Sequence, residues 1–405
     1  MNHEDIRHRG FKERTSLDEA IATLREIIEP HDRIRTQELT EAVGSVTAEP
    51  VKAPEDVPHY TRAAMDGWAV RAEDTIGASN RSPNRLRADS SVSAGTAVPV
   101  NTGEELPATA DAVVMKEQVK ESHGSLEIFT TVAVGANVGQ PGEDVSAGTD
   151  LVSTGHRLRA SDIGLLKSAG CNRVAVVDPP SVAVYPTGNE LVQADPEPGE
   201  IIETNGLVVS TLSERWGASP RYKAVIPDNH ESLASIFEKT ADTDIIVTTG
   251  GSSVGDRDLV PAMVAEYGEV VVHGVALRPG HPVAIGVVDD TPIIMLPGYP
   301  VACIVNAMQF LRRAIGWSLG TAPYPIPTTQ ATLTGKIRSE AGHRTFARVS
   351  LDRDVSPPAA IPTRASGAGI LSSVTEADGW VVIPESIEGY ADGETVQVEH
   401  WEWPW

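Results

Sequence analysis

Short apolar segments alternate with helical patterns between residues 179 and 322, and this alternation constrains the fold more than any other feature. SVAVY (181–185) and DIIVT (244–248) have the length and composition of buried strands. The patterns over 205–216 and 231–239 predict helices. Alternating strands and helices need crossover connections, so a mostly parallel sheet covered on both faces is predicted. A helix over 301–315 is expected to close this α/β domain.

Proline-rich segments bound this domain on both sides. Asp178-Pro179-Pro180 precedes it, and a linker with three prolines at 323–327 follows it. Beyond the linker, short alternating segments separated by Gly and Pro predict a small β-barrel or β-sandwich over 323–405. Residues 51–139 carry short apolar stretches broken by Gly, Pro, Asn and Asp, which predicts a β-rich domain. A helix over 16–28 is predicted from its capping box and apolar spacing.

The charge and the hydropathy pattern exclude several classes of protein. The 405 residues include 33 Lys+Arg and 56 Asp+Glu, a formal net charge of −23, which argues against a phosphate-neutralising surface for nucleic acid. No apolar run approaches the roughly 18 residues of a membrane-spanning helix. The N-terminal segment lacks the apolar stretch of a secretory signal, so a cytoplasmic location and no membrane partner are expected.

The composition also bears on salt and on cysteine chemistry. Excess carboxylate with few lysines and 5% aromatic residues is typical of proteins adapted to high salt, where ions screen self-repulsion. An ordinary acidic protein is the alternative. Cys171 and Cys303 are too few for a disulfide framework or a four-thiolate zinc site, so simple packing is expected for both.

Two polar loops follow the predicted strands, where open parallel sheets bind ligands. PTGNEL (186–191) places Glu190 at a strand end, and 204–206 can cap a helix with its N–H groups facing an anion. TTGGSSVGDRD (248–258) combines a glycine turn and hydroxyls that could cradle a phosphate with acids suited to a hard cation. Ordinary turn and cap chemistry remains the alternative for both loops. The residues concerned are Gly250, Gly251, Gly255, Ser252, Ser253, Asp256 and Asp258.

A third pair of loops carries cationic and proline residues. Arg278 and His281 flank a Pro-Gly turn in RPGHP, and Pro297 and Pro300 stiffen the loop LPGYP. Stiff loops hold donors at fixed separations, so a small oxyanion could bind here with little reorganisation. A lone loop histidine is more often simply solvated. Outside this domain, MDGWAV with Asp66 and QPGEDV with two adjacent acids support no claim on their own.

As an ordered set, these motifs resemble the molybdopterin molybdenumtransferase family, whose relatives include the E domain of gephyrin. The resemblance runs from Met65 to Glu385, nearly the whole chain. The matching stretches are MDGWAV, NTGEELPATADAVVMKE, QPGEDV, PTGNEL, TTGGSSVGDRDL, RPGHPVAIG, MLPGYPVA, GHRTFARVSL and SGAGILSSVTEADGWVVIPE.

The resemblance implies four structural parts and a reaction. The parts are an elongated one from 1–50 and 140–178, a β-rich one at 51–139, a molybdopterin-binding α/β one at 179–322 and a C-terminal β-barrel at 323–405. A homodimer with each active site shared between subunits is also implied. The implied reaction is metal-dependent cleavage of adenylylated molybdopterin with release of AMP. Molybdate is then inserted into the dithiolene to form molybdenum cofactor, with Mg²⁺ or another divalent cation required.

Site residues follow from the resemblance by position. Glu190, Asp228 and Asp258 are implied to hold the metal and, with Asp66, to act in catalysis. The implied substrate contacts comprise one residue of the β-rich part, the Gly-Ser loop, the oxyanion loops and two residues of the C-terminal part: Thr102, Gly251, Ser252, Ser253, Arg278, His281, Pro297, Pro300, Arg344 and Ser372.

Two departures from the family pattern bear on the oxyanion. Arg278 and His281 stand where the family usually has two lysines, and His is mostly neutral at pH 7 unless a nearby anion raises its pKa. Tyr299 replaces the usual Asn between Gly and Pro. Three alternatives stay open: a non-catalytic pterin-binding protein, a gephyrin-like scaffold and a tungstate-specific variant of the same enzyme.

Overall fold

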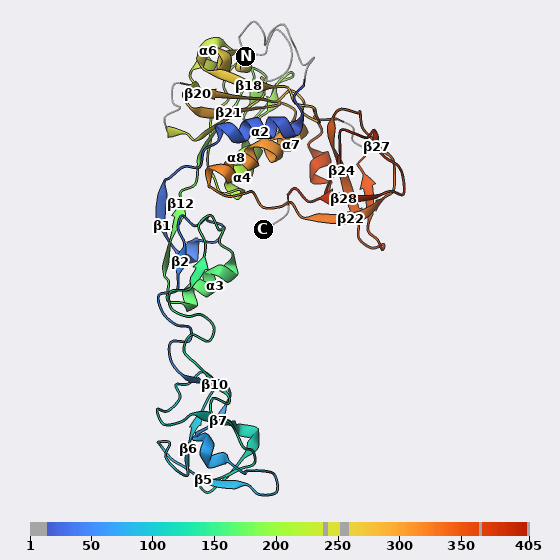
Figure 1. Cartoon of the computed structure of the whole chain (residues 1–405). Helices are drawn as coiled ribbons and strands as arrows, with labels where there is room; N and C mark the ends of the chain where they lie inside the picture. The colour runs from blue at the N-terminus through green and yellow to red at the C-terminus, as the bar shows by residue number, and fades with distance from the viewer. Residues whose placement is uncertain (1–13, 238–241, 252–258, 364–366, 403–405) are drawn as a thin grey trace. The chain divides into compact units, whose positions relative to one another are not determined.

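The computed structural model describes residues 14–237, 242–251, 259–363 and 367–402. It divides into two compact units, one formed by 1–33 with 177–405 and the other by Ile34–Val176. Figure 1 labels the helices and strands of both units. Among the described residues, no helix is long and apolar enough to cross a membrane.

The first unit contains the predicted α/β sheet. Its strand order is β16 (Ser219–Tyr222), β13 (Ser181–Pro186), β17 (Ile245–Thr249), β21 (Thr291–Leu296), β20 (Ala284–Val288) and β18 (Glu269–His273). The first four strands run parallel to one another, whereas β20 pairs antiparallel with both of its neighbours, β21 and β18. The prediction of a mostly parallel sheet is therefore confirmed. Continuous burial of β17 and β21 explains why both read as unbroken apolar runs.

Helices cover this sheet. α4 (Asn205–Arg215) packs on β13 and β16, whereas α6 (Leu259–Tyr267) packs on β18 and β20. α5 (His230–Ala234) contacts α6, and the predicted closing helix runs through α7 (Pro300–Asn306), a π-helical turn at Ala307–Leu311 and α8 (Arg312–Ser318). A cluster of apolar side chains packs between the sheet and the helices α5 and α6, with Ile246, Val264 and Ile293 at most 1% exposed.

The order of these strands creates a switch point between β13 and β17. From β13 the chain crosses to β16 on one side and then returns to β17 on the other. The loops leaving the carboxyl ends of β13 and β17 therefore diverge, and the carboxyl edge at such a switch point is where open α/β sheets generally bind ligands. This edge is where the polar loops predicted from the sequence begin.

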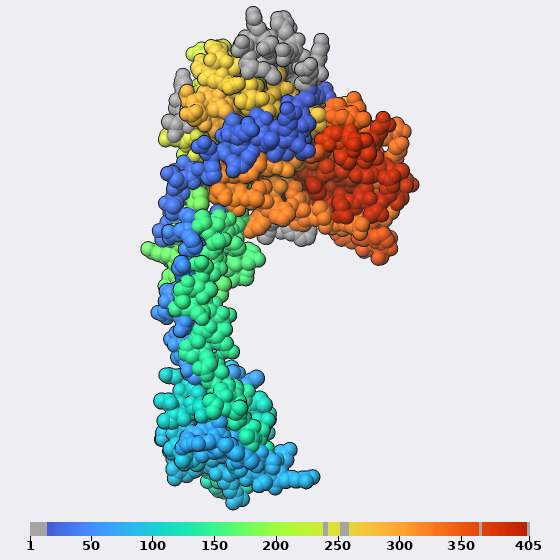
Figure 2. All heavy atoms as spheres, in the orientation of Figure 1, coloured from blue at the N-terminus to red at the C-terminus, as the bar shows by residue number. Residues whose placement is uncertain are grey.

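The N-terminal helix packs onto the same unit. In α2 (Leu17–Ile27) the hydroxyl of Ser16 accepts a hydrogen bond from Glu19 N at 3.2 Å, which confirms the predicted cap. The helix contacts α8 and β18, and Arg25 lies 5.4 Å above the Trp317 ring. Figure 2 shows the blue atoms of α2 directly against orange atoms of the segment that contains α8.

The C-terminal residues form a closed β-barrel, as predicted. Five strands pair in a ring: β24 (Arg344–Asp352), β25 (Ala359–Pro362), β22 (Thr328–Leu333), β28 (Thr395–Glu399) and β26 (Gly379–Ile383), which returns to β24. Closure leaves no free edges in the ring. A short strand, β19 (Leu277–Arg278), extends from the α/β part and pairs parallel with β24.

The second unit holds the predicted β-rich part. Its sheet order is β7 (Ala112–Met115), β4 (Gly67–Val70), β6 (Thr96–Val100), β5 (Asn84–Ala88), β9 (Ser125–Ile128) and β8 (Val119–Ser122). The rest of this unit comprises α3 (Ala160–Ser168) and short strand pairs that include β1 (Ile34–Glu38) with β12 (Arg173–Val177), β2 (Val51–Lys52) with β11 (Asp150–Val152), and β3 (Arg62–Ala63) with β10 (Val138–Gly139). The four-part domain division remains a prediction.

A buried carboxylate caps α3 in this second unit. Asp162 is 6% exposed and accepts hydrogen bonds from Arg159 N at 2.8 Å and from His156 Nε2 at 2.7 Å. The Arg159 guanidinium adds contacts at 3.0 and 3.1 Å, and together these donors hold the pKa of Asp162 well below its usual range. A carboxyl whose folded pKa is lowered stabilises the fold above its unfolded pKa.

We expect Asp162→Asn to destabilise this unit by about 1–3 kcal/mol at pH 7, because buried charge-assisted hydrogen bonds are lost. The wild-type advantage should begin to shrink as the pH falls below about 4, the unfolded carboxyl pKa, and should be lost completely only below the lowered folded pKa, so it should be smaller at pH 3 than at pH 7. Hydrogen exchange of residues 156–168 in the full chain at pH 7 and pH 3 measures both effects. Asp150→Asn, at an exposed ion pair with Lys52, serves as the control. Equal protection of α3 in both variants would contradict the prediction.

Candidate functional site

Three loops meet at the carboxyl ends of β13, β17 and β21. Thr187 N donates to Thr249 O at 3.0 Å, and Gly250 N donates to Leu296 O at 3.0 Å. A methyl group built on Gly298 would lie 3.5 Å from Gly250 Cα, so the loops after β17 and β21 are in close contact. The polar loops predicted separately from the sequence therefore share one edge of the sheet.

Glu190 and Asp228 lie on adjoining segments at this edge. Residues 226–228 run beside the loop after β13, because Gly188 N donates to Ile226 O at 3.2 Å and Asp228 N donates to Asn189 Oδ1 at 3.0 Å. Glu190 is exposed and turns back over Gly188, where an added methyl group would lie 2.9 Å from its Oε1. Two carboxylates implied by the resemblance are thus brought to neighbouring loops.

The glycine turn after β17 packs tightly against Thr187 in the loop after β13. Gly250 and Gly251 have φ values of 106° and 62°, a conformation that other residues rarely adopt. A methyl group on Gly250 would lie 2.3 Å from Thr187 O, so no side chain fits there. The remaining predicted residues of this loop, Gly255, Ser252, Ser253, Asp256 and Asp258, lie outside the described residues.

The start of α4 differs from its sequence-based prediction. Glu203, 5% exposed, accepts a hydrogen bond from Gly206 N at 2.6 Å and a short one from the Tyr222 hydroxyl. Burial and the Glu203 carboxylate raise the pKa of Tyr222. The expected anion site at 204–206 is therefore wrong, because a carboxylate already lies at this helix terminus.

The RPGHP loop is anchored by a residue that the sequence analysis missed. Asn306, fully buried in α7, donates from Nδ2 to Gly280 O at 3.0 Å and to Ala302 O at 2.8 Å. Gly280 has φ 110°, and a methyl group there would lie 2.1 Å from Asn306 Nδ2. An Asn in the apolar run VACIVNAMQF was the available signal, since buried polar groups are normally hydrogen-bonded.

Cationic groups gather around this loop. Arg278, half-exposed, pairs with Glu340, and Arg14 contacts His343. Burial and the positive charges of Arg14, Arg278 and His343 lower the pKa of His281. Arg14 and His343 were not predicted, because they reach the loop only through backbone pairing of Thr15 with Val275 and of β19 with β24.

The LPGYP loop lies beside the C-terminal part. Pro297 is buried, Pro300 occupies the first turn of α7, and Tyr299 is 67% exposed. Val301 N donates to Ala368 O at 3.0 Å, and a methyl group on Gly369 would lie 3.5 Å from the Tyr299 ring. Ser372 follows closely in the chain, exposed at the start of α9 (Ser372–Thr375).

Arg344 forms ion pairs with two carboxylates. Its guanidinium pairs with Asp18 of α2 at 2.8 and 3.0 Å, and its Nε lies 2.9 Å from Glu385 Oε1. These hydrogen bonds raise the pKa of Arg344 and lower that of Asp18. In this structure Arg344 ties the N-terminal helix to the barrel beside Leu277, its partner in the strand register.

Asp66 and Thr102 are hydrogen-bonded to each other in the second unit. The backbone N and the hydroxyl of Thr102 each lie 2.7 Å from Asp66 Oδ1, and both residues are exposed. These two hydrogen bonds hold the pKa of Asp66 below its usual value. The carboxylate is therefore ionised and fixed in orientation, which suits a residue that contacts a cation or a donor group.

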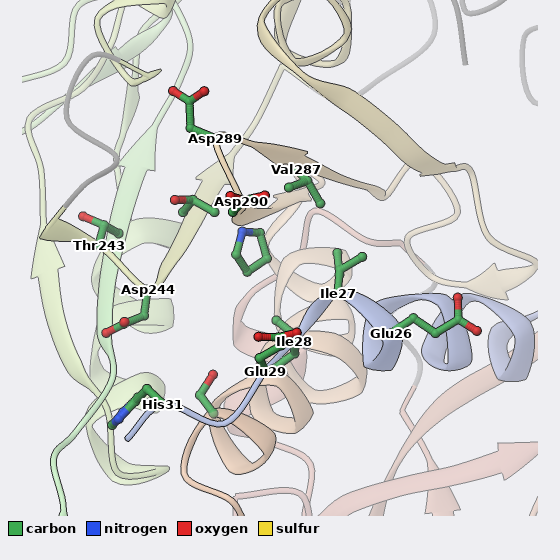
Figure 3. A pocket seen from close by; sticks show the side chains of 13 residues that line it. Glu26, Ile27, Ile28, Glu29, His31, Thr243, Asp244, Val287, Asp289 and Asp290 are labelled. Carbon is green, nitrogen blue, oxygen red and sulfur yellow. The ribbon is translucent and has the colours of Figure 1, made fainter. Parts of the chain in front are cut away.

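A separate cavity lies at the opposite, amino ends of β17 and β21. It has a volume of about 620 Å³ and is lined by residues that include His31, Asp244, Asp289 and Asp290 (Figure 3). Asp244 forms an ion pair with Arg33 at 2.5 Å. This cavity shares no lining residue with the switch-point loops, so it is distinct from the site predicted from the sequence.

The described residues define a class of protein. A parallel α/β sheet with a switch point carries an acidic loop, a glycine turn and a cationic loop on one unit, the arrangement of a domain that binds an anionic ligand at the strand ends. Within the described ranges no group of three or more His, Cys, Asp or Glu side chains could hold a metal ion.

Comparison with family models then names the family. Residues 15–170 match the MoeA N-terminal region (domain I and II), 183–316 match a probable molybdopterin binding domain and 330–401 match the MoeA C-terminal region (domain IV). The chain belongs to the MoeA family.

Individual relatives agree with these matches. The molybdopterin molybdenumtransferase of Bacillus subtilis is 32% identical over 91% of this chain and 91% of its own length. Molybdopterin molybdenumtransferase 2 of Mycobacterium tuberculosis is 32% identical over 90% of this chain and 94% of its own length. A crystal structure of the molybdopterin biosynthesis MoeA protein of Pyrococcus horikoshii superposes with a TM-score of 0.81 at 30% identity, covering 95% of this chain and 99% of that chain.

We expect Asn306→Ala to lower the free energy of unfolding by about 1–3 kcal/mol, because the Gly280 and Ala302 carbonyls lose a buried donor. The RPGHP loop should also lose protection against hydrogen exchange. Urea denaturation and exchange of residues 277–283 measure the two effects, with the exposed amide variant Gln330→Ala as control. A variant with unchanged stability and an equally protected loop would show that Asn306 does not anchor it.

Proposed function

We propose that this chain is a molybdopterin molybdenumtransferase, which cleaves adenylylated molybdopterin, releases AMP and inserts molybdate into the dithiolene. The observation that supports this most is the meeting of the acidic loop, the glycine turn and the LPGYP loop at one edge of the α/β sheet. The relatives named molybdopterin molybdenumtransferase match over about nine-tenths of the chain, which supports the same reaction.

Each loop has a separate task in this proposal. The glycine turn at Gly250–Gly251, with Ser252 and Ser253, holds phosphate oxygens, since backbone can approach closely where side chains are absent. Arg278 and His281 attract the oxyanion, and Asn306 keeps their loop in place through Gly280. Pro297 and Pro300 make the neighbouring loop stiff, so little reorganisation is needed when molybdate binds.

The acids are assigned to a divalent cation. Carboxylate oxygens are the ligands that Mg²⁺ prefers, and Glu190 and Asp228 lie on adjoining loops, which fits such an ion. Asp258 is the third proposed ligand. Bound there, the cation would supply charge neutralisation for the pyrophosphate. Asp66, oriented by Thr102, is the proposed contribution of the second unit, with Arg344 and Ser372 from the barrel as further candidates.

Several wider properties belong to the same proposal. We propose a cytoplasmic homodimer with each site shared between subunits, and activity at high salt in keeping with the net charge of −23. Tungstate in place of molybdate is a variant of this function, supported by Arg278, His281 and Tyr299 at the oxyanion end. A pterin-binding or gephyrin-like scaffold is the second candidate, which the acids on adjoining loops disfavour because a scaffold does not need them.

The direct test supplies adenylylated molybdopterin, Mg²⁺ and molybdate at high salt and measures AMP. We expect AMP from the wild type and a loss of at least a hundredfold in Asp258→Asn, because a metal ligand is removed, with stability changed by less than about 1 kcal/mol. Asp289→Asn, at the other end of the sheet, should retain activity. No AMP from a folded wild-type dimer would leave the scaffold function.

The pH dependence of oxyanion binding tests His281. Its lowered pKa keeps the imidazole neutral at pH 7, so protonation takes place below about 6.5 and adds positive charge beside Arg14, Arg278 and His343. We expect molybdate affinity to rise several-fold between pH 7.5 and 5.5, and the rise to be smaller in His281→Gln. His123→Asn, at an exposed turn of the second unit, is the control. Identical profiles for wild type and His281→Gln would remove His281 from the oxyanion site.

A further inference from the structure

Three threonine hydroxyls are buried at the switch point without a hydrogen-bond partner among the described residues. They belong to Thr187, Thr248 and Thr249, at the carboxyl ends of β13 and β17, and the three residues are at most 1% exposed. A buried hydroxyl without a partner is costly, because water is lost and nothing replaces it. Such groups at the ligand-binding edge of a sheet therefore need an explanation.

Thr187 is the one of the three that lies directly beneath the glycine turn. A methyl group built on Gly251 would lie 3.0 Å from Thr187 Oγ1, and one built on Gly250 would lie 3.3 Å from the same atom. Thr248 and Thr249 belong to strand β17 itself, ahead of the turn. The hydroxyl of Thr187 is thus adjacent to the two glycines that form the turn after β17.

The backbone around Thr187 holds this hydroxyl in place. Its N donates to Thr249 O at 3.0 Å, and it forms a parallel bridge with Ile226. The same residue therefore contacts the strand that leads to the glycine turn and the segment that leads to Asp228. A β-branched side chain has few χ1 rotamers, so the hydroxyl is preorganised at low entropic cost.

We propose that the Thr187 hydroxyl donates a hydrogen bond to a phosphate oxygen of the bound substrate. This assignment rests on the proposed function and adds a phosphate-binding residue to it. Phosphate is the fitting group, because it offers strong acceptor oxygens to a neutral donor beside a glycine turn with positive φ. The partner that the hydroxyl lacks among the described residues is supplied when the phosphate binds.

The assignment makes stability and binding respond in opposite directions. Valine has nearly the shape of threonine without the hydroxyl, so Thr187→Val removes an unsatisfied buried group from the free protein. We expect the melting temperature of the free protein to rise. Affinity for inorganic pyrophosphate, measured by calorimetry with Mg²⁺ present, should fall about tenfold, the size of one hydrogen bond. At a residue with only a structural role, the substitution would not raise the melting temperature and at the same time lower the affinity for pyrophosphate.

Matched variants isolate the hydroxyl. Thr187→Ser keeps it and should bind pyrophosphate within about twofold of the wild type, as one conserved hydrogen bond implies. Ser181 lies at the amino end of the same strand and also has a buried hydroxyl without a partner, so Ser181→Ala should leave pyrophosphate binding unchanged. If Thr187→Val folds poorly, comparison of Thr187→Ser with Thr187→Ala decides the question, because both shorten the side chain.

Two results would overturn the proposal. Equal pyrophosphate affinity with and without the hydroxyl would remove Thr187 from the phosphate site. Weaker molybdate binding with unchanged pyrophosphate binding would place the hydroxyl at the oxyanion instead. The AMP assay is separate: pyrophosphate binding that depends on Thr187 in a protein that releases no AMP would refute the proposed reaction and leave this assignment standing.

Discussion

The parallel pairing of β13 with β17 is the interaction on which the rest of the site depends. It joins two strands whose connections leave in opposite directions, so their carboxyl ends form the switch point at which open α/β sheets generally bind ligands. The acidic loop, the glycine turn and the LPGYP loop all lie there because each leaves a strand of the same parallel set. A shift in that register would move Thr187 away from Gly250 and Gly251.

Around this edge, polar side-chain contacts hold the loops and helix ends in place. Asn306 fixes the RPGHP turn, Glu203 caps α4, and Arg344 links α2 to the barrel through Asp18 and Glu385. The Asn306 and Arg344 contacts join segments that are distant in the sequence, whereas Glu203 caps the helix that begins directly after it. They stabilise positions without occupying the loop residues themselves, so the loops can present backbone and charge to a ligand.

The electrostatic pattern separates the two ends of the α/β sheet. Arg14, Arg278, His281 and His343 lie near the oxyanion loop, whereas Asp244, Asp289 and Asp290 line the cavity at the amino ends of the strands. In a chain with a net charge of −23, the guanidinium groups of Arg14 and Arg278 can locally attract an anion that the rest of the surface repels. The Thr187 hydroxyl, which has no partner among the described residues, adds a neutral donor to this arrangement.

The sequence by itself determined the parallel sheet, the terminal barrel and the loops that carry Glu190, Gly250 and Arg278, because hydrophobic periodicity and turn residues are local signals. The family followed from motifs in order along the chain. Only the tertiary structure decided that Glu203 occupies the start of α4, that Asn306 anchors Gly280, and that Arg14 and His343 approach His281. Those contacts join residues between about 3 and 330 positions apart, and a side-chain partner depends on how strands and helices pack, which no local pattern encodes.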